Sequence, residues 1–188
     1  MNMNTPRHIF LIGLSGSGKS TIGKILAGKL RRPFVDIDKT IEKQTHMTIN
    51  DIFVEKRESA FRKMESRAIM KTARKRKRPK VVALGGGAFE KRSNRKSVES
   101  SGISVWLRCS IEELYKRLKN KTDRPLLNNK MKTLTSGPAE PMRRLKHLLK
   151  KRQKNYRKAD IYVSTSKRTP RAVSSEIIQK MKSKYEAH

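Results

Sequence analysis

Acidic residues, cysteines, aromatics and long apolar runs are all scarce in this chain of 188 residues. The single cysteine, Cys109, excludes an intramolecular disulfide framework and a multi-cysteine zinc site, and it is typical of a reducing compartment. The longest early apolar run, at residues 9–12, is too short for a signal-peptide core or a membrane span. We therefore expect a soluble, cytoplasmic protein, and we expect it to be a monomer.

Lysine and arginine outnumber aspartate and glutamate by 47 to 16, which gives a net charge of +31. Composition alone would permit a disordered basic protein. The apolar residues, however, fall into periodic segments that are separated by turn residues, and this pattern predicts a packed fold. A chain of 188 residues suits one domain, so we expect a single domain over 1–188.

Short apolar runs alternate with amphipathic segments along the chain. The runs predict strands at 9–12, 34–37, 81–84, 103–107 and 161–163. Helical spacing of apolar residues follows these runs: from residue 20, over 39–74 with interruptions, and around 111–118 and 173–181. This alternation predicts an α/β fold of three layers, α/β/α, with a central parallel sheet and ligand sites at the carboxyl ends of its strands.

The segment GLSGSGKST at 13–21 fits a phosphate-binding loop, with an apolar run before it and an amphipathic segment after it. Glycines let successive N–H groups point at phosphate oxygens, Lys19 supplies a charge to the β and γ phosphates, and Ser20 can ligate Mg²⁺. The alternative is a glycine-rich turn with an accidental Lys-Ser. The residues expected to bind ATP here are Gly13, Ser15, Gly16, Ser17, Gly18, Lys19, Ser20 and Thr21.

Two pairs of charged residues follow the loop. Asp36 and Asp38 lie at the end of a predicted strand, where an extended chain would point both side chains the same way, one to the metal and one to an acceptor hydroxyl. Asp38 could instead cap a helix. Arg62 and Glu65, three apart on a predicted helix, suit either a structural ion pair or a guanidinium fork aimed at a carboxylate.

Residues 120–141 contain Asn128, Gly137 and Pro138 and show little periodicity. A segment of this length is too long for an ordinary connector, and it predicts a mobile lid; a flexible insertion is the alternative.

Taken in order, these residues resemble the shikimate kinase family over nearly the whole chain. The resemblance rests on the joint order of eight short segments: the loop at 13–21, VDID at 35–38, MTINDIF at 47–53, FR at 61–62 with Glu65, GGG at 85–87, RPLL at 124–127, Arg152 with Tyr156, and AD at 159–160. It implies the phosphate-loop fold of the nucleoside monophosphate kinases. It also implies ATP- and Mg²⁺-dependent phosphorylation of the 3-hydroxyl of shikimate to shikimate 3-phosphate.

The resemblance also implies roles for single residues. Positions that bind shikimate in the family are matched here by Asp38, Arg62, Gly85, Gly86, Gly87 and Arg152. Asp36 and Ser20 match Mg²⁺ positions, and Arg117 and Arg168 match positions near the adenine. Lys19, Asp38 and the lid residue Arg124 are the expected catalytic residues: the two cations stabilise the transferring group and Asp38 accepts from the attacking hydroxyl.

Two other functions remain open from the residues alone. Another small-molecule kinase of this fold, acting on gluconate or a nucleoside monophosphate, would share the loop, although Asp38 with Arg62 suits a polyhydroxy carboxylate. A basic nucleic-acid-binding NTPase is the second alternative.

The excess charge has two interpretations. Residues 143–158 contain nine lysines and arginines, and a second basic run covers 71–80. They form either a solvated surface or a surface that attracts nucleic acid non-specifically at low salt. Tyr156, the aromatic residue within these runs, is expected in the core or the site and not as a stacking platform, so we expect no sequence-specific binding.

Overall fold

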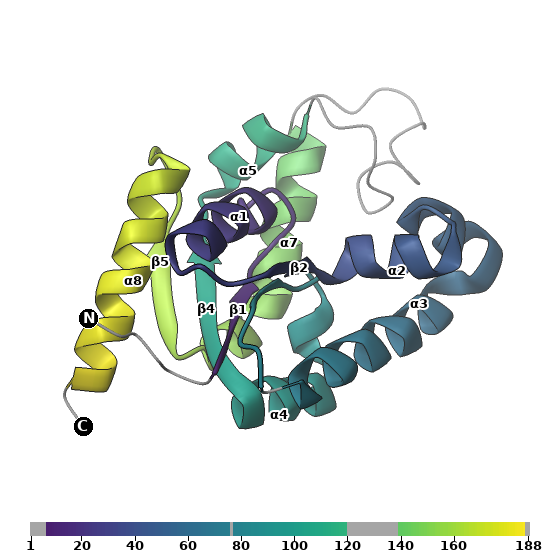
Figure 1. The fold of residues 1–188 in the computed structure, drawn as a ribbon. Helices are drawn as coiled ribbons and strands as arrows, with labels where there is room; N and C mark the ends of the chain where they lie inside the picture. Colours follow the sequence, from purple (N-terminus) through teal and green to yellow (C-terminus); the bar gives the residue numbers. More distant parts are fainter. Residues whose placement is uncertain (1–6, 76, 120–138, 187–188) are drawn as a thin grey trace.

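The computed structural model describes residues 7–75, 77–119 and 139–186. A central sheet is covered by helices on both faces (Figure 1). Five strands form it in the order β2-β3-β1-β4-β5, and all neighbours are parallel. The strands are β1 (His8–Ile12), β2 (Phe34–Asp36), β3 (Val81–Ala83), β4 (Gly102–Arg108) and β5 (Ile161–Ser164). The predicted three-layer α/β/α fold is confirmed.

The helices divide between the two faces of the sheet. Two of them cover one face: α1 (Lys19–Lys29) and α8 (Pro170–Glu186). The opposite face carries α2 (Ile37–Thr45), α3 (Ile49–Arg74), the 3₁₀ turn η1 (Ala88–Glu90), α4 (Arg92–Ser101), α5 (Ile111–Leu118) and α7 (Ala139–Tyr156).

The central strand β1 is buried along its whole length, since it pairs with β3 on one side and β4 on the other. A strand covered on both faces needs a continuous apolar sequence, and HIFLI supplies it from Ile9 onward. Successive side chains alternate between the two cores. Phe10 and Ile12 join the core under α3, α4 and α7, whereas Ile9 and Leu11 join the core under α1 and α8.

The predicted helical stretch at 39–74 is interrupted where local chemistry requires it. His46, with φ 55°, ends α2, and Thr48 begins α3 with a capping box whose other member is Asp51. Within α3, Arg57 has φ 63° and ψ 161°, which kinks the helix between its two halves. This kink gives the second half of α3 its own direction across the sheet.

The predicted lid at 120–141 lies mostly outside the described residues. Its last three positions, 139–141, are the first residues of α7. In the part of the chain that is described, no helix is both long enough and apolar enough to cross a bilayer.

The core under α4 offers a matched test of burial. Val98 on α4 is fully buried, whereas Val54 on α3 is 66% exposed. We expect Val98→Ala to lower the free energy of unfolding by about 2 kcal/mol, because it removes two buried methyl groups and leaves a cavity. Val54→Ala should change it by less than about 0.5 kcal/mol. Urea unfolding of both variants checks this, and equal effects would contradict the assigned core.

Candidate active site

The loop between β1 and α1 is a tight turn that only glycine permits. Gly13, Gly16 and Gly18 all have positive φ, at 141°, 83° and 93°. A Cβ on Gly13 would also lie 2.7 Å from the Leu107 carbonyl oxygen of β4. The loop therefore wraps closely over the end of the sheet and leads directly into the N-terminus of α1, where backbone N–H groups favour an anion.

The ammonium of Lys19 lies inside this loop. Its Nζ donates to the carbonyl oxygens of Gly13 and Leu14, both at 2.9 Å, and only 9% of the residue is exposed. A cation held in a nearly dry loop interacts more strongly with a phosphate than one in bulk water. Lys19 therefore concentrates positive charge where the sequence predicted the terminal phosphates.

Ser20 and Asp36 form a two-oxygen site beside the loop. The Ser20 Oγ donates to Asp36 Oδ2 at 2.6 Å. Mg²⁺ is a hard cation that takes oxygen ligands and usually binds one or two protein groups together with phosphates and water. One hydroxyl and one carboxylate fit that preference. The described residues contain no cluster of three or more acidic, histidine or cysteine side chains that would form a metal cage.

The geometry expected for Asp36 and Asp38 was wrong. The chain turns into α2 directly after Asp36, so the two residues do not share an extended strand. Asp36 is the N-cap, and its Oδ1 accepts from the backbone N–H of Asp38 at 3.1 Å and of Lys39 at 3.4 Å. The cap is thus Asp36, whereas Asp38 lies in the first turn of α2. Both nevertheless face one cavity.

The turn at 85–87, directly after β3, is where the acceptor side of the site converges. A Cβ on Gly85 would lie 2.3 Å from Glu65 Oε1 and 2.9 Å from Asp38 Oδ1. One on Gly87 would lie 2.8 Å from Arg62 Nη2. Side chains from α2 and α3 therefore occupy the space that any side chain on this turn would need.

Arg62 and Glu65 form the ion pair that their spacing predicted. Arg62 Nη1 lies 2.9 Å from Glu65 Oε2, and its Nη2 lies 2.9 Å from Glu58 Oε1. The side chain of Glu65 is only 1% exposed, and burial raises its pKa although the charge of Arg62 opposes the shift. The pair fixes the guanidinium at the edge of the cavity, where Arg62 retains 27% exposure toward a ligand.

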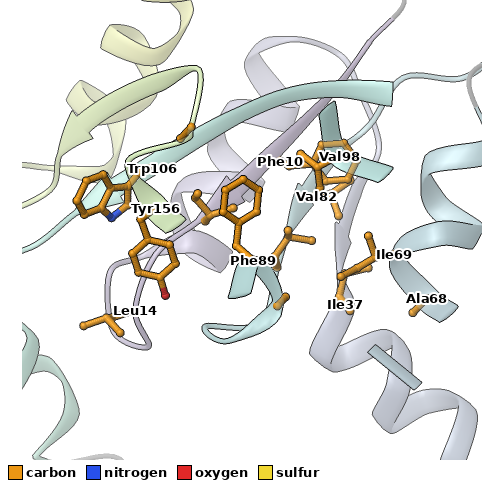
Figure 2. Packing of buried hydrophobic residues seen from close by; sticks show 14 of the residues in the cluster. Phe10, Leu14, Ile37, Ala68, Ile69, Val82, Phe89, Val98, Trp106 and Tyr156 are labelled. Carbon is orange, nitrogen blue, oxygen red and sulfur yellow. The ribbon is translucent and has the colours of Figure 1, made fainter. Parts of the chain in front are cut away.

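Arg152 and Tyr156, one turn apart on α7, approach the same turn from the other side. Arg152 is 7% exposed, and a Cβ on Gly86 would lie 3.3 Å from its Nη1. The Tyr156 hydroxyl donates to the Gly86 carbonyl, and burial raises its pKa, so it stays a donor at ordinary pH. Its ring centroid lies 5.6 Å from that of Trp106, and Figure 2 shows the two rings side by side.

Arg117 and Arg168 lie at the opposite end of the cavity. Arg117 donates to the Thr165 carbonyl at 2.8 Å and the Gly16 carbonyl at 3.4 Å, which ties the phosphate-binding loop to the end of β5. Arg168 donates to the Ser164 carbonyl and pairs with Glu176. Both lie beside the loop, on the side away from the turn at 85–87.

One cavity of about 640 Å³ joins these parts. The predicted residues that line it are Ser15, Gly16, Gly18, Lys19, Ser20, Thr21, Asp36, Asp38, Arg62, Gly85, Gly86, Gly87, Arg117, Arg152 and Arg168. Of the described predicted residues, Gly13 and Ser17 are not among its lining; Ser17 is buried. Arg124 lies outside the described residues. The cavity opens at the carboxyl ends of β1, β2 and β3, as the fold class predicted.

Some residues of the site were not among those predicted to bind a ligand. Tyr156 was named only together with Arg152, although its position four residues later places both side chains on one helical face and was a usable signal. Thr165 and Pro170 line the cavity beside Arg168, and no motif pointed to them.

Residues 15–182 match the protein-family model described as shikimate kinase. The chain belongs to the shikimate kinase family. It is 41% identical to the shikimate kinase of Sulfurihydrogenibium sp. over 94% of this chain and 98% of that relative. It is 39% identical to that of Persephonella marina over 94% of this chain and 99% of the relative.

Solved structures agree with this membership. A shikimate kinase from Acinetobacter baumannii in complex with shikimate superposes with a TM-score of 0.86 at 33% identity, covering 96% of this chain and 95% of that one. The shikimate kinase of Aquifex aeolicus gives a TM-score of 0.77 at 31% identity, with 95% and 98% coverage. A gluconokinase from Sinorhizobium meliloti gives 0.54 at 19% identity over 97% and 98% of the chains, so it shares the fold alone.

The hydrogen bond from Tyr156 to the turn is testable. Tyr156→Phe keeps the ring but leaves the Gly86 carbonyl without its donor, a loss worth about 1–3 kcal/mol. We expect the KM for the acceptor to rise about tenfold while the KM for ATP stays unchanged. Tyr162→Phe is the matched control, because the Tyr162 hydroxyl donates to the Arg157 carbonyl on an exposed surface. A rise in both KM values would instead indicate a general loosening of the fold.

Proposed function

We propose that this member of the shikimate kinase family phosphorylates the 3-hydroxyl of shikimate with ATP. One observation carries the proposal: the phosphate-binding loop and the group formed by Asp38, Arg62 and Arg152 line the same cavity. A triphosphate and a small acceptor bound there would meet within it. Phosphoryl transfer demands mainly such positioning together with neutralisation of charge.

The residues at the nucleotide end of the cavity supply positive charge to the triphosphate. The β and γ phosphates bind against Lys19 and the N–H groups at the start of α1, and the adenine lies near Arg117 and Arg168. Ser20 and Asp36 would hold Mg²⁺, which would supply charge neutralisation at the phosphates. The role predicted for Arg124 stays a prediction, as do the monomeric state and the cytoplasmic location.

The acceptor end suits a carboxylate that carries several hydroxyls. Arg62 and Arg152 bring two guanidinium groups to the glycine turn, and guanidinium forks match a carboxylate. Asp38 accepts a hydrogen bond from the 3-hydroxyl. The hydroxyl oxygen attacks the γ-phosphorus, the bond to the β–γ bridging oxygen breaks, ADP leaves, and the hydroxyl proton passes to the Asp38 carboxylate.

The two alternatives fit less well. A gluconate or nucleoside monophosphate kinase shares the fold, but the family model and relatives near 40% identity are those of shikimate kinases. A basic nucleic-acid-binding NTPase would have no use for the two guanidinium groups and the carboxylate that the cavity gathers at the glycine turn.

The proposal is tested by measuring ADP release with Mg²⁺-ATP and a panel of acceptors: shikimate, gluconate, a nucleoside monophosphate and a polynucleotide. We expect shikimate alone to stimulate release, with phosphate appearing on its 3-hydroxyl. Stimulation by another acceptor without stimulation by shikimate would refute the proposal.

Asp38→Asn is the informative variant in the same assay. It keeps the size of the side chain but removes the proton acceptor, and we expect kcat with shikimate to fall by about a hundredfold or more. ATP binding should remain, because Lys19 and the loop are unchanged. Wild-type turnover in Asp38→Asn would remove this residue from the mechanism.

A further inference from the structure

The cations of this chain far exceed what the cavity uses, and many gather on one layer of helices. α3, α4 and α7 pack on the same face of the sheet: Ala68, Val98 and Leu145 all join one core. Lys91 on the turn before α4 donates to Ser66 of α3 at 3.2 Å, and Asn155 of α7 donates to Glu90 of η1 at 3.3 Å. The three helices therefore belong to one layer, whose outer sides face away from the sheet.

Each of these helices presents cations on its outer side. We define the basic face by two exposed residues from each helix: Arg67 and Arg74 of α3, Arg92 and Lys96 of α4, and Lys150 and Lys154 of α7. Members of a pair are four or seven residues apart, so each pair lies along one side of its helix. None of the six side chains makes an ion pair with a residue that the structure describes.

Acidic residues are almost absent around the basic face. The sequence has none between Glu65 and Glu90 and none between Glu140 and Asp160, and Glu99 is the single one in α4. A surface that served only to keep the protein in solution would tolerate mixed signs. Apart from the exposed Glu99, three residues after Lys96, the basic face carries only positive charge across three helices.

The kinase chemistry does not account for this face. The residues of α3 and α7 that line the cavity, such as Arg62 and Arg152, lie on their inner sides, and none of the six cations of the basic face is among the lining. The two helices therefore have separate inner and outer roles.

We propose that the basic face binds the phosphate backbone of double-stranded nucleic acid without regard to base sequence. Phosphates recur at short, regular intervals along a duplex, and an array of cations binds them by releasing counterions. Among the described residues, the exposed large apolar side chains are Val54 and Met70 of α3 and Tyr162 of β5, and only Met70 lies between cations of the basic face. One such side chain is far fewer than the apolar stripe of a membrane-binding helix, and the basic face has no aromatic platform of the kind that binds single strands.

The test compares two double variants of equal net charge. Arg92→Gln with Lys96→Gln removes two cations from the basic face, and Lys24→Gln with Lys182→Gln removes two from α1 and α8, on the opposite face. Fluorescence anisotropy with a labelled mixed-sequence duplex is followed from about 50 to 200 mM salt. With about six phosphate contacts, the wild-type slope of log K against log salt should be about −5.

We expect the basic-face variant to reduce the magnitude of that slope by about two and to weaken binding about tenfold or more, whatever the duplex sequence. The control variant should bind as the wild type does, and both should keep the wild-type unfolding temperature. Equal losses in the two variants would show that only net charge matters and would overturn the proposal. Tighter binding of a single strand of equal length, or of vesicles containing phosphatidylserine, would overturn it as well.

Discussion

The turn at residues 85–87 has no space for side chains, and the acceptor end of the cavity depends on that constraint. Glu65, Asp38, Arg62 and Arg152 all lie within contact distance of where a Cβ would stand. Because these side chains come from α2, α3 and α7, the turn sets the position of three helices relative to the end of β3. Tyr156 completes the arrangement by holding the turn through the Gly86 carbonyl.

Two of these helices, α3 and α7, carry functional residues on their inner sides and exposed cations on their outer sides. On the inner side of α3, the ion pair with Glu65 fixes the guanidinium of Arg62, and α7 carries Arg152 in a nearly buried position. Their outer sides carry cations of the basic face, which form no ion pair with a residue that the structure describes. Catalytic geometry can therefore persist while the outer charge changes, since buried contacts and not surface charges hold the inner sides in place.

Local patterns predicted much of this structure. The apolar run followed by GLSGSGKST is a local signal, because it depends only on neighbouring residues, and it predicted β1, the loop and α1. The alternation of apolar runs with amphipathic segments predicted the parallel sheet. Asp36 and Asp38 were misplaced because a helix cap, not the strand before it, decides where their side chains point. The contact of Tyr156 with Gly86 joins residues 70 positions apart and depends on how α7 packs. The sequence alone therefore indicated only that Tyr156 lies one helical turn after Arg152.

The glycine turn must stay free of side chains if the acceptor is to bind, and calorimetric titration with shikimate measures this requirement. Gly85→Ala would place a Cβ 2.3 Å from Glu65 Oε1, whereas Gly28→Ala on α1 meets nothing within 4 Å and serves as the control. We expect Gly85→Ala to weaken shikimate binding about tenfold or more with ATP binding intact, and Gly28→Ala to bind both ligands normally. Wild-type shikimate affinity in Gly85→Ala would contradict it.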